Sequence, residues 1–201
     1  GEYISFLEPD DIWEKDNAAI KISFLENNGI DLVYSDIQAI GDSVTIDMRR
    51  LTINSFSRVS AGVPFFALPE LFVDNFVPSF STVIARKKVF DNIKFISDKK
   101  CAIWLDWFLW LQISLHMKFL FVPQKLVRWR LYQRSYCNAF IYRSGVMRRI
   151  LFDLRYRLMI FREIIFSSQG NLWQKITLSF MFVRASFKKG FLFLYHRFKK
   201  I

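Results

Sequence analysis

Glycine, cysteine and histidine are scarce in this chain of 201 residues, and each scarcity excludes a class of protein. The seven glycines are not spaced as a P-loop or a Rossmann fingerprint requires, so this sequence contains neither nucleotide-binding loop. The two cysteines, Cys101 and Cys137, form no disulfide framework and indicate a reducing environment. His116 and His196 are isolated, and the sequence shows no zinc cluster and no Ser-His-Asp triad.

Long apolar runs are missing as well. No uncharged apolar window of about 18 residues occurs, which argues against an ordinary membrane-spanning helix, and no secretory signal is recognisable. The composition is nevertheless 52% hydrophobic with 23 phenylalanines, which is too apolar for a disordered chain and sufficient for one domain with a core. The chain enters an apolar run directly after Gly1, so we expect an upstream portion in a longer protein.

Charge is distributed unevenly along the chain. Residues 1–124 contain 12 Lys/Arg and 16 Asp/Glu, a net charge of −4, whereas residues 125–201 contain 17 Lys/Arg and 2 Asp/Glu, a net charge of +15. The second part is also rich in Phe, Leu and Ile. This asymmetry indicates a polyanionic partner surface, either lipid headgroups or nucleic acid.

An acidic cluster, Glu8-Pro9-Asp10-Asp11, follows the apolar run at 3–7, which predicts a strand. Carboxylates at the end of a buried strand are costly unless a positive charge lies among them. Mg²⁺ or Mn²⁺ prefers oxygen ligands and commonly shares them with substrate phosphates. The pattern therefore predicts a metal site. An equally weighted alternative is a turn in which Asp11 caps a helix beginning near Trp13.

Asp106 is the single acid in the apolar run Trp104-Leu105-Asp106-Trp107-Phe108-Leu109-Trp110. Burial among aromatic side chains should raise its pKa, because desolvation disfavours the charged form. A carboxylate with a raised pKa is a better general base near neutral pH. The alternative is an isolated acid at a helix start, whose neighbours fill the core.

Arg128 and Arg130 alternate with apolar residues in a strand-like run at 126–132. Guanidinium groups bind diphosphates bidentately, so these two arginines are candidate ligands of a phosphate group. A solvent-exposed edge strand is at least as good an interpretation.

Strands alternating with helices predict an α/β sheet. We expect strands at 3–7, 31–36, 81–86, 119–122 and 126–132, the last two separated by Pro123. We expect helices at 13–27, 64–75 (broken at Pro69), 102–117, and a basic helical region from about 138, with a helical turn at 87–92 and loops at 48–63 and 93–100.

The order of these pieces resembles the family 2 glycosyltransferases, which have the GT-A fold. The family pattern Gly-x-Tyr-Ile-x-Phe-Leu-Asp-x-Asp-Asp-x-Trp is matched by residues 1–13, with Glu8 in place of the first Asp. A Val-Tyr-Ser-Asp strand follows at 33–36, a Ser-Thr-Val-Ile-x-Arg strand at 81–86, and an Asp-Trp-x-Leu-Trp-Leu box at 106–111, preceded by Leu105 in place of the usual Glu. A Pro-x-x-Leu-Val-x-x-Arg element lies at 123–130, and Tyr132 stands where many relatives have His.

The resemblance implies the catalytic part of a GT-A mixed sheet at 1–135, without the N-terminal nucleotide-binding part. It assigns Asp10 and Asp11 to a DxD-type element that holds a nucleotide-sugar diphosphate, with UDP as the expected nucleotide, through Mg²⁺ or Mn²⁺. Glu8, Asp10, Arg128 and Arg130 would contact this co-substrate, and Asp106 would be the base on the acceptor hydroxyl. The implied reaction is sugar transfer with inversion to a glycan or lipid-linked acceptor, in bacterial surface polysaccharide synthesis.

Residues 136–201 match no family motif, and we expect a basic helical tail. Basic residues set among Phe, Leu and Trp at 138–201 predict contact with an anionic membrane surface, at the inner face of the cytoplasmic membrane. A basic helical pair packed on the catalytic domain is an equally good interpretation. A second hypothesis for the whole chain is a non-catalytic basic module on membrane or nucleic acid, of which nucleic acid is the weaker choice.

Overall fold

The computed structural model describes most of the N-terminal two thirds of the chain and part of the remainder: residues 1–27, 29–47, 59–91, 93, 105–133, 146–166, 171–173, 175–177, 179–180 and 183. These residues form two compact units, one comprising the described residues up to Gln133 and the other those from Val146 onward. The boundary expected at 135 therefore falls between the described parts of the two units. The loops expected at 48–63 and 93–100 lie mostly outside the described residues.

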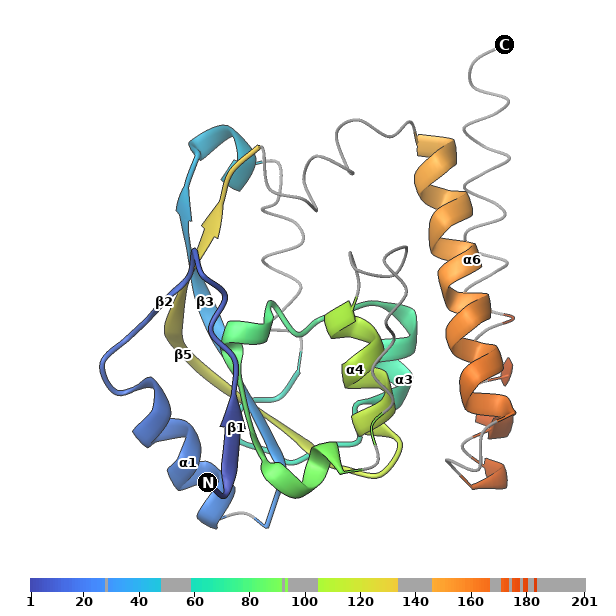
Figure 1. The fold of residues 1–201 in the computed structure, drawn as a ribbon, viewed down its shortest axis with the longest axis horizontal. Helices are drawn as coiled ribbons and strands as arrows, with labels where there is room; N and C mark the ends of the chain where they lie inside the picture. Colours follow the sequence, from blue (N-terminus) through green and yellow to red (C-terminus); the bar gives the residue numbers. More distant parts are fainter. Residues whose placement is uncertain are drawn as a thin grey trace. The chain divides into compact units, whose positions relative to one another are not determined.

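The first unit is a mixed α/β layer structure around a five-stranded sheet (Figure 1). The strands are β1 (Tyr3–Ser5), β2 (Ile12–Trp13), β3 (Leu32–Gly41), β4 (Val83–Arg86) and β5 (Phe119–Leu131). Their spatial order is β1-β4-β3-β5-β2. All neighbours are antiparallel except β3 and β5, which run parallel. The expected α/β sheet with flanking helices is thus confirmed at this level.

Helix α1 (Asn17–Asn27) packs against β3, β4 and β5. Its buried Leu25 joins a core cluster with Val33, Ile84 and Leu120 of these strands. α1 also buries two polar side chains, Asn17 and Lys21, which are fully inaccessible to solvent. No hydrogen-bond partner for either side chain is found among the described residues.

The remaining elements of the first unit are α3 (Leu68–Val73), α4 (Leu105–Ser114) and the 3-10 turns η1 (Phe80–Thr82) and η2 (Lys87–Phe90). α3 packs on α4, and the Trp107 indole N–H donates to the Leu71 carbonyl at 2.5 Å. In the same unit the Tyr34 ring packs on Phe76, with ring centroids 5.9 Å apart, and on Phe121, with centroids 5.2 Å apart.

Three of the expected elements differ from the structure. The helix expected from Trp13 begins only at Asn17, because Ile12 and Trp13 pair with Val127 and Arg128 of β5 as strand β2. Pro69 does not break a helix; it lies in the first turn of α3, where its missing N–H has no intrahelical acceptor.

The two strands expected around Pro123 form the single strand β5. Its pairing with β3 passes from Ser35–Val122 to Asp36–Lys125 and omits Pro123 and Gln124. Proline has no N–H to donate to the ladder, so a local irregularity accommodates it without ending the strand.

The second unit contains helix α6 (Val146–Ile165) and the described residues from Asn171 to Val183, which are mostly helical. The expectation of helices after about 138 agrees with this part. No helix in the described residues is both long and apolar enough to cross a membrane.

Candidate active site

The acidic loop leaves β1 and is fixed on η1 by hydrogen bonds to its backbone. The Glu8 N–H donates to Ser81 Oγ at 3.0 Å, and the Asp11 N–H donates to the Glu8 carbonyl at 3.1 Å, closing a tight turn around Pro9. At the far end of the loop, the Trp13 indole N–H donates to the Ser81 carbonyl at 2.8 Å. Ser81 therefore anchors both ends of the loop.

Asp11 is the buried member of the cluster, and its carboxylate connects the loop to β5. Oδ1 accepts the Arg130 backbone N–H at 3.0 Å, and Oδ2 lies 3.5 Å from the hydroxyl of Ser79. Burial raises the pKa of Asp11, and hydrogen bonds from Ser81, Arg130 and Ser79 oppose that rise. The helix-cap alternative for Asp11 is wrong, because β2 follows it and α1 begins only at Asn17.

Glu8 and Asp106 come together although 97 residues lie between them in the sequence. Burial, and after it the negative charges of Asp11, Asp106 and Asp10 in that order, together raise the pKa of Glu8 to about 7. Such repulsion requires short separations. The fold therefore gathers the four acids that the sequence singled out into one region of negative charge.

Asp106 lies in the first turn of α4 and accepts two hydrogen bonds. Its Oδ1 accepts the Trp107 N–H at 2.7 Å, and its Oδ2 accepts the Asn75 side-chain amide at 3.1 Å. Asn75 is itself held by the Val77 N–H, which donates to Asn75 Oδ1 at 3.3 Å. Burial raises the pKa of Asp106 to about 6, in the direction expected from its apolar neighbours, although these hydrogen bonds act against it.

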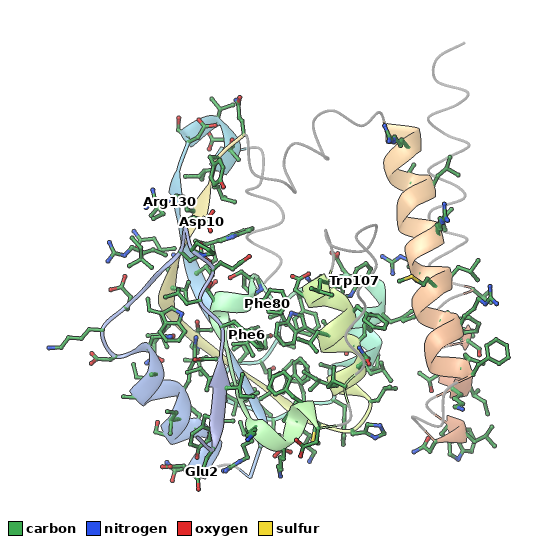
Figure 2. The ribbon with its side chains drawn as sticks, in the orientation of Figure 1. Glu2, Phe6, Asp10, Phe80, Trp107 and Arg130 are labelled. Atoms are coloured by element: carbon green, nitrogen blue, oxygen red, sulfur yellow. The ribbon has the colours of Figure 1, made fainter. Side chains whose placement is uncertain are left out.

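Aromatic rings connect the acidic loop with α4. Phe6, just before the loop, packs on Phe80 with ring centroids 5.1 Å apart, and Phe80 packs on Trp110 of α4 at 5.4 Å. Figure 2 shows Phe6 and Phe80 near one another in the middle of the first unit. These contacts explain how α4 brings Asp106 to the loop.

The two candidate arginines have different surroundings. Arg130 is exposed, and its Nε donates to the Asp10 carbonyl at 3.0 Å, so its guanidinium group lies at the acidic turn (Figure 2). Arg128 forms an ion pair with Glu14, with 2.9 Å between Nε and Oε1, and both side chains are about 40% exposed. The Arg130 guanidinium therefore lies at the acidic turn, whereas the Arg128 guanidinium is paired with Glu14.

The donor set fits a hard divalent cation that shares its ligands with a substrate. Within the described residues, no three carboxylate, histidine or cysteine side chains are spaced to enclose a metal ion by themselves. Among the described residues, no group donates a hydrogen bond to the side-chain carboxylate of Glu8 or of Asp10. Mg²⁺ characteristically binds one or two carboxylates and completes its shell with phosphates and water. A cation would also relieve the repulsion that raises the pKa of Glu8.

Three residues that fix the site were not identified from the sequence, namely Asn75, Ser79 and Ser81. They lie in or next to loops and a 3-10 turn, where no hydrophobic periodicity exists to indicate them. Ser81 was assigned only to the start of a strand, and Asn75 to the end of a helix. A scan against protein-family models finds no match for this chain, and a search of curated proteins finds no significant match.

Proposed function

We propose that this chain is the catalytic part of an inverting glycosyltransferase with a GT-A-like fold. It would move a sugar from a nucleotide-sugar donor to a hydroxyl of a glycan or lipid-linked acceptor. The observation that carries the proposal is the proximity of the Glu8–Asp11 loop to α4, the helix that holds Asp106 in its first turn. The ring contacts Phe6–Phe80 and Phe80–Trp110 join the two. A metal-and-diphosphate loop beside a general base is the arrangement that such a transfer needs.

Asp106 is the proposed base. With a pKa of about 6, its carboxylate is mostly ionised at neutral pH and is still basic enough to take a proton. The acceptor oxygen forms a bond to the anomeric carbon while its proton passes to Asp106. The bond from that carbon to the diphosphate breaks, and its electron pair leaves on the nucleoside diphosphate. The Trp107 N–H and the Asn75 amide keep the carboxylate in one orientation throughout.

Asp10 and Asp11 are the proposed ligands of Mg²⁺ or Mn²⁺, and Glu8 lies next to them. Asp10 offers an unengaged carboxylate, and Asp11 keeps acceptor capacity beyond its hydrogen bonds, because a carboxylate has about four acceptor positions. When bound, the cation supplies positive charge that stabilises the leaving diphosphate. Arg130 would add a second positive group at the same turn, and Arg128 would do so after release from Glu14.

The setting that we propose is the inner face of the bacterial cytoplasmic membrane, where the enzyme would build a surface polysaccharide from a UDP-linked sugar. The acidic loop would take the negatively charged donor through its bound cation, and the basic C-terminal part would take an anionic surface. The net charge of +15 in residues 125–201 supports the second of these assignments.

The proposal is tested by release of nucleoside diphosphate from a panel of UDP-sugars, using the full-length protein with Mn²⁺ or with a chelator. We expect metal-dependent release that Asp106→Asn suppresses by about a hundredfold or more while donor binding is retained. Asp91→Asn, at an exposed acid outside the cluster, is the matched control and should leave turnover unchanged. Unchanged turnover in Asp106→Asn would refute the base assignment, and release that persists with chelator would refute the metal assignment.

A further inference from the structure

The helical segment after Asn171 partly buries two of its polar side chains, while it exposes several large apolar ones. Lys175 and Ser179 are partly buried. The Lys175 ammonium group donates to the carbonyl of Ile165, the last residue of α6, at 3.0 Å, and Ser179 donates to the Lys175 carbonyl at 2.8 Å. A lysine on the final carbonyls of a helix is favourable, so Lys175 holds this segment against the end of α6.

The same segment carries large apolar groups that face solvent. Trp173 is 76% exposed and Phe180 is 70% exposed. We define the outward apolar face as five exposed residues of this segment: Leu172, Trp173, Ile176, Phe180 and Val183. Their spacing of three or four residues places them on one side of a helix. Apolar groups gathered in this way mark an interaction site more often than isolated exposed ones do.

Helix α6 of the same unit adds exposed positive charge. Arg148, Arg155 and Arg162 are exposed, and exposed Leu151 and Leu158 alternate with them at steps of three and four residues. Phe166, just after α6, is the most exposed of the large apolar residues described, at 81%. The second unit thus combines arginines with apolar side chains at its surface.

We propose that the second unit binds the surface of an anionic lipid bilayer, with the outward apolar face inserted at the level of the headgroups and the α6 arginines on lipid phosphates. Charge complementarity favours this partner, since residues 134–201 contain 14 Lys/Arg and 2 Asp/Glu, a net charge of +12. Such helices lie in the plane of the interface rather than crossing it.

The same observations disfavour two other binding partners of the second unit. A second copy of the chain would bring two strongly positive segments together, which opposes association. The phosphates of a nucleic acid could bind the arginines. Leu172, Ile176 and Val183 cannot stack on bases, however, so they would stay exposed to solvent in that complex. Lipid is the one partner that takes up both the charge and the aliphatic groups.

Sedimentation of the full-length protein with vesicles tests the proposal. We expect binding to vesicles of phosphatidylglycerol and phosphatidylethanolamine and much weaker binding to phosphatidylcholine alone. The double variant Trp173→Glu/Phe180→Glu should lower the partition coefficient by about tenfold or more. The triple variant Arg148→Gln/Arg155→Gln/Arg162→Gln should lower it by on the order of a hundredfold on anionic vesicles. Phe66→Glu, at an exposed phenylalanine of the first unit, is the matched control and should bind as the parent does.

Insertion is separated from simple charge attraction by lipids with brominated acyl chains, which quench tryptophan at the membrane interface. We expect quenching in the parent protein and its reduction in Trp173→Phe. Loss of sedimentation only in the arginine variant, without quenching, would overturn the inserted face. Parent-like binding by Trp173→Glu/Phe180→Glu would also overturn it, as would self-association or RNA binding that this double variant abolishes while vesicle binding stays unchanged. None of these outcomes depends on sugar transfer.

Discussion

The backbone N–H of Arg130 donates a 3.0 Å hydrogen bond to the carboxylate of Asp11, and this bond joins the acidic loop to the last part of β5. Through it, the residue that carries a candidate phosphate-binding guanidinium also orients a candidate metal ligand. Asp11 therefore has a structural role that exists whether or not a cation is bound, and neighbouring Asp10 does not share that role through its side chain.

Substitution should separate these two acids. Asp11→Ala would leave the Arg130 N–H and the Ser79 hydroxyl without their acceptor, so we expect a loss of about 1–3 kcal/mol in the free energy of unfolding. It should also abolish metal-dependent transfer. Asp10→Ala should remove metal-dependent transfer with little change in stability. Urea unfolding and diphosphate release measure the two effects, and equal destabilisation by both variants would contradict the assignment.

Asn75 is predicted to be a positioning residue for Asp106. Its amide donates to Asp106 and so favours the charged form of that carboxylate. Asn75→Ala should therefore raise the pKa of Asp106 further, and the rise of kcat with pH should move from about 6 to a higher value. Gln38→Ala, at an exposed amide of β3, is the control and should keep the parent profile. A uniform fall of kcat without a shifted profile would indicate that Asn75 only supports the fold.

Cation binding should depend on the proton carried by Glu8. The pKa of Glu8 is about 7 without metal, so protons compete with the cation below that value. Calorimetric titration with Mn²⁺ should show affinity rising with pH through about 7. In Glu8→Gln this dependence should flatten, since the group no longer titrates. A steep dependence that survives in Glu8→Gln would assign the proton to another group.

Lys21 should give the fold a distinct alkaline dependence of stability. Burial lowers its pKa from 10.5 to about 7, so between these values the unfolded chain binds more protons than the folded chain. The free energy of unfolding should therefore rise as pH increases through this window, and this contribution is lost as pH falls to about 7.

Lys21→Met should remove that dependence. We expect a gain on the order of 3 kcal/mol near neutral pH, shrinking as pH approaches 10.5. Lys15→Met, at an exposed lysine just before α1, is the control and should have a much smaller effect. Urea unfolding at several pH values makes the comparison, and a destabilised Lys21→Met at neutral pH would show that the buried ammonium group has a partner.

The sequence patterns predicted the elements that contain continuous apolar runs. The core of β3 and the helix around Trp107 were identified because burial on both sides leaves almost no polar residue in them. The patterns failed at 12–16, where a helix was expected to begin at Trp13. β2 has only two residues, which is too short to show the alternation of apolar and polar residues that predicts a strand. Pairing with Val127 and Arg128 makes these two residues a strand.

The candidate site was predictable in its acids and not in the groups that hold them. Carboxylates next to apolar runs are conspicuous, so Glu8, Asp10, Asp11 and Asp106 could be identified directly. The hydrogen bonds that Asn75 and Ser79 donate, and the one that Ser81 accepts from the Glu8 N–H, join residues 31 to 73 positions apart, and composition does not encode such tertiary contacts. The pairing of Arg128 with Glu14 arises in the same way, from β2 lying beside β5.

The omission of Pro123 and Gln124 from the β3–β5 pairing has a consequence for how this protein can tolerate changes in length. Side chains alternate between the two faces of a strand, so adding or deleting one residue at that point would turn every downstream side chain of β5 over. The upstream half would keep its place in the core, while the Arg130 guanidinium would leave the acidic loop and the Arg128 guanidinium would leave Glu14. Relatives with the same chemistry should therefore differ in length almost anywhere else on the surface before they differ at this pair.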